Sequence, residues 1–212
     1  MLKELGSTDD RRMVRNRSKR NTSSCGDRRS SLARRPLLTL QEVVDAYILE
    51  WQPRCWVAFH EGHRTPKAAL DLVASWRDED RKIYSHQTRV PREAKKDAGN
   101  AIRNLDVDAI RDFEDLFECV DRAIGSIPGI GDLTVYDVAA RLGASLGKLP
   151  AKRVYLQSGA LKGARALGVD VSQRSLAVAA FPPELHRLAA WEIEDLLCVY
   201  KDELRLVRGA AA

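Results

Sequence analysis

The chain has 212 residues, of which 44% are apolar, enough for one packed domain with or without a tail. No stretch reaches the roughly 18 consecutive apolar residues of a membrane-spanning helix, and the N-terminus lacks the apolar segment of a secretory signal. The four cysteines (Cys25, Cys55, Cys119 and Cys198) form no C-x-x-C pair. Composition therefore argues against a membrane or secreted protein and predicts a cytoplasmic one with reduced thiols.

The net charge of +5 is unevenly distributed. Residues 1–36 hold 11 Lys/Arg and 4 Asp/Glu, a balance of +7, so the remaining residues carry −2. This arm is poor in apolar side chains, and we predict that it is disordered because it cannot bury enough surface to offset its ordering entropy. A basic, flexible arm can add salt-sensitive affinity for nucleic acid. The alternatives are a solvated tail without function or an over-long gene start.

Helical periodicity dominates residues 37–208, which we predict to form an all-α, single compact multi-helix domain. Thr39 and Glu42 have the spacing of a capping box, and Thr65-Pro66 suits an N-cap followed by the first helical residue. At most a trace of strand is expected, near Val154–Leu156. The expected helices cover Leu40–Trp51, a short piece through Trp56–Phe59, Thr65–Arg77, Pro91–Asn104, two runs at 110–124 and 135–146, a helix entered through Ser158-Gly159, and Trp191–Val207.

The most informative stretch is SIPGIGDLTVYDVAARLGASL, at Ser126–Leu146. Its segment Ile127–Gly131 forms a tight hairpin between two apolar runs of helical spacing. Proline fixes one φ angle in such a turn, and the two glycines permit positive φ and close backbone approach. The turn amides of Gly129, Ile130 and Gly131 are expected to lack intrahelical partners at the start of the second helix. Unpaired N–H groups and the positive end of a helix dipole attract an anion.

The pattern h-P-G-h-G-x-x-T-h-x-x-h resembles the helix-hairpin-helix motif of DNA-binding and DNA-repair proteins. Its threonine is Thr134. The resemblance covers about residues 110–146. It implies binding of the DNA backbone without base specificity, through the turn residues Gly129, Ile130, Gly131 and Thr134. It also implies a monovalent cation on the hairpin carbonyls; no other cofactor is expected. Residues 80–204 further resemble bacterial proteins without an assigned function.

Asp132 departs from this pattern, because many members of the family carry a lysine or arginine there. A carboxylate at that position can cap the helix and would repel a phosphate. The alternative to phosphate contact is an ordinary turn between two helices, whose amides bond to water or to a side chain.

The charge of the chain changes sign just after the hairpin. Residues 105–137 carry nine acids and two bases, whereas residues 138–169 carry six bases and no acid. A basic run beside an anion-seeking turn favours phosphate neutralisation, and it adds Arg141, Lys162 and Arg165 to the predicted DNA contacts. Ser158 and Gly159, at a glycine-led helix start, are weaker candidates for a second phosphate contact. The alternative is a set of solvated cations that face different ways.

An enzyme is less well supported than a binding protein. In lyase-active DNA glycosylases, which share the hairpin, the resemblance implies a lysine where Leu133 stands and an aspartate near Ala151. The groups that would act as nucleophile or stabilise the transition state are therefore missing. Cys55, His60 and His63 lack the spacing of a zinc motif, so no metal site is expected. Glu192, Glu194 and Asp195 are best explained as the solvated face of the last helix.

These observations favour non-sequence-specific DNA binding, of duplex DNA and through phosphates, in DNA repair or processing. An alternative is a protein–protein adaptor that uses the hairpin as a packing unit. Another is an atypical glycosylase-like enzyme. DNA affinity that falls steeply with salt would favour the first hypothesis, and a stable protein complex without DNA binding would favour the adaptor.

The glycosylase comparison yields a testable expectation. Because Leu133 and Ala151 replace the reactive groups, purified protein should neither release bases from DNA nor nick abasic DNA. Borohydride treatment with labelled abasic duplex measures this, since it traps any lysine–sugar adduct. Efficient trapping would show that a different lysine acts as a nucleophile.

Overall fold

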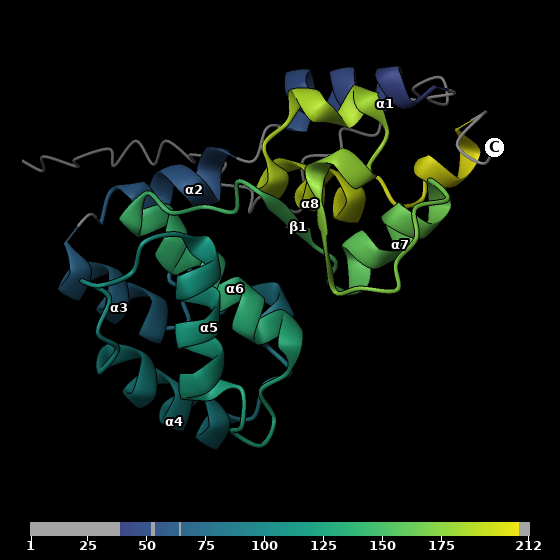
Figure 1. The fold of residues 1–212 in the computed structure, drawn as a ribbon. Coiled ribbons are helices and arrows are strands. Elements are labelled where there is room, and N and C mark those ends of the chain that lie inside the picture. The colour runs from purple at the N-terminus through teal and green to yellow at the C-terminus, as the bar shows by residue number, and fades with distance from the viewer. Residues whose placement is uncertain (1–38, 52–53, 64, 208–212) are drawn as a thin grey trace, which may run out of the picture.

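The computed structural model describes residues 39–51, 54–63 and 65–207, and this part of the chain is mostly helical, as predicted (Figure 1). The basic arm lies outside the described residues. In chain order the α-helices are α1 (Leu40–Ala46), α2 (Arg54–Glu61), α3 (Pro66–Ala74), α4 (Arg92–Arg103), α5 (Phe113–Ile124), α6 (Asp132–Leu146), α7 (Ser158–Ala166) and α8 (Ala190–Val199). Strands β1 (Arg153–Tyr155) and β2 (Ser175–Ala177) pair antiparallel, with Val154 opposite Leu176. Within these ranges, no helix is long and apolar enough to cross a membrane.

Helix starts follow the sequence signals more closely than helix ends. The Thr39 and Glu42 capping box forms at α1, and the Thr65 side chain accepts the amide N–H of Ala68 at α3. α3 ends at Ala74, before the predicted Arg77, because Trp76 adopts a left-handed conformation with φ of 60°. The last predicted helix is also too long. α8 ends at Val199, and a 3-10 turn follows at Leu204–Leu206.

The apolar side chains form two clusters. The first cluster lies among α3, α4, α5 and α6, and its fully buried members include Ile102, Leu116 and Leu142. The second cluster lies among α1, β1, α7 and α8, and it includes Tyr47 and Leu197. The first and last parts of the described chain thus share one cluster, while the intervening helices form the other (Figure 1).

Strand β1 joins the two clusters. Successive side chains of a strand point to opposite faces, so Val154 packs into the second cluster and Tyr155 into the first. The Tyr155 ring lies 5.0 Å from Phe117 and 5.5 Å from Tyr136, measured between centroids. A second link is the edge contact between Trp56 of α2 and Trp191 of α8, at 5.9 Å.

Two glycines bring α7 against α8. A Cβ atom on Gly159 would overlap the sulfur of Cys198, and one on Gly163 would overlap the carbonyl oxygen of Leu197. The Gly159-x-x-x-Gly163 spacing puts both on one face of α7, so the two helix backbones approach closely. Gly159 is therefore a packing residue, and its presence is explained without the phosphate contact considered from the sequence.

This packing can be tested with Gly163→Ala. The added methyl group meets backbone and not a flexible side chain, so the substitution should lower the free energy of unfolding by about 1–3 kcal/mol. Urea unfolding followed by circular dichroism measures the change. Lys162→Ala, at an exposed position of the same helix, is the control and should be nearly neutral. Equal stability of Gly163→Ala and the parent would contradict the close approach.

Candidate nucleic-acid interface

The turn between α5 and α6 is compact and internally bonded. The amide N–H of Ile127 donates to the carbonyl of Ile124 at 3.1 Å, and that of Ile130 donates to Ile127 at 3.0 Å. The Ile130 side chain is buried in the first cluster. The expectation that the Ile130 amide is free for an anion is therefore wrong: this residue anchors the turn from inside.

Gly129 fixes the turn against the start of α4. It has φ of 93°, which an L-residue adopts only with strain. A Cβ atom there would lie 2.9 Å from Cδ of Pro91 and 3.5 Å from Cβ of Ala94. Both the left-handed backbone and the close contact require glycine, so the hairpin turn and the N-terminus of α4 are held together.

Gly131, two residues further on, has open space around it. It is exposed, it is the N-cap of α6, and nothing lies within 4 Å of the position of a Cβ atom. The amide of Thr134 donates back to the carbonyl of Gly131 at 2.8 Å. The amides of Asp132 and Leu133, in the first turn of α6, have no intrahelical acceptor, as at every helix start. The positive end of a 15-residue helix is thus presented beside an unobstructed glycine.

The carboxylate of Asp132 pairs with Arg174, 2.5 Å away, across the surface. Arg174 comes from the segment that leads into β2. The sequence predicts that Asp132 either caps the helix or repels a phosphate. In the structure its side chain forms no capping hydrogen bond, and Arg174 balances its negative charge. The ion pair is exposed, so it contributes little to stability. Its effect is to offset the negative charge next to the turn.

Two more of the predicted contact residues are largely covered by the protein. Thr134 is buried, and the side chain of Arg141 is 11% exposed. Arg141 lies 3.5 Å from the ring centroid of Tyr84 and 3.4 Å from the carboxylate of Asp137. A guanidinium held in this way binds an aromatic face and a carboxylate inside the protein, so neither side chain is available to a phosphate.

A histidine lies behind this arginine. His60, fully buried, bonds through Nε2 to the hydroxyl of Tyr84 at 2.9 Å, while its Nδ1 has no hydrogen-bond partner. Burial, with smaller contributions from Arg141 and His63, lowers the pKa of His60 to about 3. Burial likewise raises the pKa of Tyr84 to about 12. His60 is therefore a neutral core residue of α2.

Burial also raises the pKa of Glu194 well above its usual value, with added repulsion from Asp195 and then Asp137. Glu194 is half-buried, so it belongs only in part to the solvated face that the sequence predicts. Glu192 bonds the backbone N–H of Ala189 at 2.9 Å and caps α8.

Most cations of the basic run at 138–169 contact other groups of the protein. Lys148 donates to the carbonyl of Arg111, Lys152 pairs with Asp112 at 3.3 Å, and Arg153 bonds the backbone of Ser175. Lys162 and Arg165 are exposed, but they lie on α7, which packs against α8 in the second cluster (Figure 1). The acidic and basic halves thus partly neutralise each other, and the structure joins neither Lys162 nor Arg165 to the turn.

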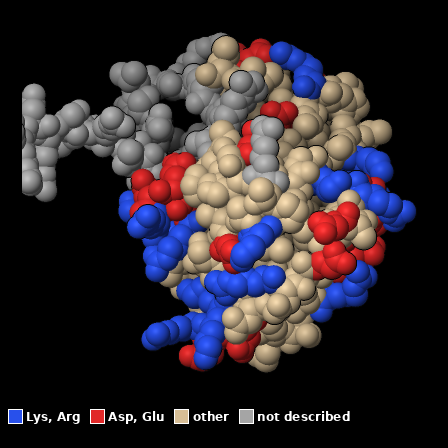
Figure 2. All heavy atoms as spheres, turned by 90° about the vertical axis from the view of Figure 1, so that its left-hand side faces the viewer, with Lys and Arg blue, Asp and Glu red and all other residues tan. Residues whose placement is uncertain are grey.

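A different set of cations lies beside the hairpin. A groove of about 280 Å³ runs between α4 and the segment that follows α3. Five cationic side chains line it, and no acid does. They are Arg77, Arg92, Lys95, Lys96 and Arg103. Figure 2 faces the side of the molecule that carries α3 and α4, and Lys and Arg side chains gather in its middle and lower left.

Sequence reasoning missed this groove, although a signal was present. Arg92, Lys95, Lys96 and Arg103 recur at offsets of three, four and eleven residues, which lie on one side of a helix. The sequence cannot show that Arg77 and Trp76 close the groove from the other side, because that depends on the left-handed turn at Trp76.

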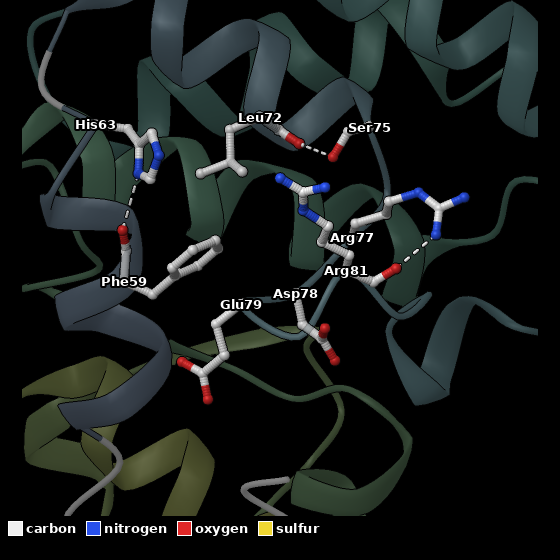
Figure 3. A pocket seen from close by; sticks show the side chains of 8 residues that line it. All are labelled: Phe59, His63, Leu72, Ser75, Arg77, Asp78, Glu79 and Arg81. Carbon is white, nitrogen blue, oxygen red and sulfur yellow. Dashed lines mark hydrogen bonds between the residues drawn. The ribbon is translucent and has the colours of Figure 1, made fainter. Parts of the chain in front are cut away.

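A larger hollow of about 680 Å³ lies between α2 and the turn after α3 (Figure 3). Its lining mixes the cations Arg77 and Arg81 with the carboxylates of Asp78 and Glu79, and Phe59 and His63 close the other side. This balance of charge suits neither an anion nor a cation.

Within the described residues, no group of three or more His, Cys, Asp or Glu side chains could hold a metal ion. Cys119 and Cys198 are free thiols. Two hairpin carbonyls, of Ile124 and Ile127, accept hydrogen bonds from amides of the turn, and the monovalent cation on the hairpin carbonyls stays a prediction. Leu133 is half-buried and Ala151 is exposed.

The chain matches no protein-family model, and comparisons with curated proteins and with solved structures found no match.

The buried histidine predicts a pH dependence of stability. The pKa of His60 is lower in the folded protein than in the unfolded chain, so below about pH 6.5 only the unfolded chain takes up the proton. Stability should therefore fall with decreasing pH, by about 2 kcal/mol between about pH 7 and pH 5 from this group alone.

Urea unfolding of the parent and of His60→Gln at the two pH values measures this effect. The other histidines contribute equally to both proteins, so the difference between their pH dependences isolates His60. An equal loss of stability in both proteins would contradict a neutral buried His60.

Proposed function

We propose that this protein binds DNA without sequence specificity, by holding backbone phosphates at the turn between α5 and α6 as a helix-hairpin-helix motif. The observation that carries the proposal is the open side of the turn: exposed Gly131, with nothing within 4 Å of its Cβ position, at the N-terminus of α6. Backbone amides and the helix dipole bind a phosphate but carry no information about base sequence.

Three features support an anionic ligand at this place. The left-handed Gly129 holds the turn against Pro91, so the amides are fixed before a ligand arrives. Arg174 offsets Asp132, so the one carboxylate of the turn is balanced. The cations of α4 begin at Arg92, directly after Pro91. A preformed donor set beside positive charge is what phosphate contact requires.

The proposal differs from the sequence prediction in its residues. Gly129 and Gly131 stay in the site, and Asp132 and Leu133 enter it through their amides. Ile130 supports the turn from the core. Thr134 leaves the site because it is buried, and Arg141 leaves it because Tyr84 and Asp137 hold its guanidinium. Lys162 and Arg165 leave it because they belong to α7.

A matched pair of substitutions at Asp132 tests the amide contact. Asp132→Asn and Asp132→Pro both remove the carboxylate, but only proline also removes the amide N–H. Proline fits the first position of a helix, and the extended backbone of Gly131, with φ of −115° and ψ of 171°, suits a residue before proline. The two variants therefore differ mainly in one donor.

Asp132→Asn should bind a mixed-sequence duplex somewhat more tightly than the parent, because a negative charge is gone. Asp132→Pro should bind about tenfold more weakly than Asp132→Asn, the effect of one charge-assisted hydrogen bond. Fluorescence anisotropy measures both, and circular dichroism checks that both fold. Indistinguishable affinities of the two folded variants would exclude the amide contact and favour the adaptor hypothesis.

A further inference from the structure

The groove along α4 holds more positive charge than the fold neutralises. Of its five cations, Arg103 pairs with Asp71 at 3.6 Å, and Asp71 is shared with Lys67. Lys95 and Arg77 donate to backbone carbonyls, which carry no net charge. Among the described residues, neither Arg92 nor Lys96 has an ion pair. Like charges on facing walls repel one another, so the groove is electrostatically costly without an anion.

The groove is also built with strained and restricted backbone. Trp76 has φ of 60°, an uncommon conformation for a bulky residue, and its indole N–H donates to the carbonyl of Lys95 at 2.9 Å. A Cβ atom on Gly99 would lie 3.1 Å from the carbonyl oxygen of Ala74 and 3.4 Å from the indole nitrogen. These contacts set the spacing of the two walls.

Arg92 is unfavourably placed for helix stability. It is the first residue of α4, where the helix dipole disfavours a positive charge. It is exposed and forms no ion pair within the described residues. Its charge is therefore better explained by a ligand than by the stability of α4.

The groove begins where the hairpin turn ends. Pro91, which touches Gly129, immediately precedes Arg92, and the lining cations then follow α4 to Arg103. The 12 residues of α4 span about 18 Å, and successive phosphates of one strand lie about 3.4 Å apart along a duplex axis. Helix α4 is therefore long enough to contact several phosphates in addition to the one held at the turn.

We propose that the α4 groove is a second phosphate-binding surface, which takes the backbone of the same DNA that the hairpin binds. This inference rests on the proposed function. It assigns Arg92, Lys95 and Lys96 as phosphate contacts. The DNA backbone then follows a track along α4 and does not contact the protein at the turn alone.

The test removes two groove charges at exposed positions, with Arg92→Gln and Lys96→Gln combined. The slope of log affinity against log salt for a mixed-sequence duplex should become shallower by about two, since each lost phosphate contact removes about 0.9. The control is Arg187→Gln with Arg205→Gln, which removes equal charge from exposed positions near the second cluster. The slope of this control variant should differ from the parent slope by less than about 0.5, half the change expected for one lost phosphate contact.

Asp132→Pro, measured in the same assay, separates the two proposals. A loss of slope in the groove variant together with weaker binding of Asp132→Pro supports both. An unchanged slope in the groove variant, with Asp132→Pro still weakened, overturns the groove and leaves the hairpin. Loss of slope without any effect of Asp132→Pro supports the groove and overturns the hairpin contact. Failure of the parent to bind duplex overturns both.

Inorganic phosphate added to the parent–duplex complex identifies the source of the ligand. If the groove holds phosphates only as part of a polymer, phosphate should displace duplex no better than sodium sulfate of equal ionic strength. Displacement by phosphate well beyond the sulfate control, which disappears in the groove variant, would overturn the track and indicate a site for a free phosphate.

Discussion

The two-sided packing of strand β1 determines where the candidate interface lies. Tyr155 fills the space between α5 and α6, with its ring 5.1 Å from Phe113, so it fixes the pair of helices that the turn connects. Val154, on the other face, belongs to the second cluster. Because β2 pairs with β1, and the carbonyl of Arg174 accepts the amide of Leu156 at 2.8 Å, Arg174 lies within reach of Asp132. The charge balance at the turn therefore depends on a short strand pair.

Local signals in the sequence predicted what depends on local chemistry. The helix starts at Thr39 and Thr65 were found because a cap is a contact between residues three apart. The turn between α5 and α6 was found because proline and glycine limit the backbone directly. The sequence allows at most a trace of strand near Val154–Leu156, and the structure has β1 at Arg153–Tyr155, paired with β2.

Long-range contacts account for what the sequence did not predict. The sequence predicts that Arg141 is a surface cation, because nothing near it in sequence reveals that Tyr84, from a distant connector, covers it. The same reason applies to Glu194, which is half-buried although periodicity places it on a solvated face. The groove needs Trp76 in a left-handed conformation, which no propensity favours for tryptophan. Burial of charge and strained backbone are set by the whole fold, so periodicity alone does not reveal them.

The order of the two clusters along the chain has a consequence for synthesis. The first cluster draws on residues 69–142 and Tyr155, so it is complete once that tyrosine has been made. The second needs α1 from the beginning and Leu204 near the end. Closing so long a loop costs entropy before its contacts form. Until the segment up to Leu204 has left the ribosome, Val43, Val44 and Tyr47 therefore lack part of their partners, and α1 docks late in synthesis.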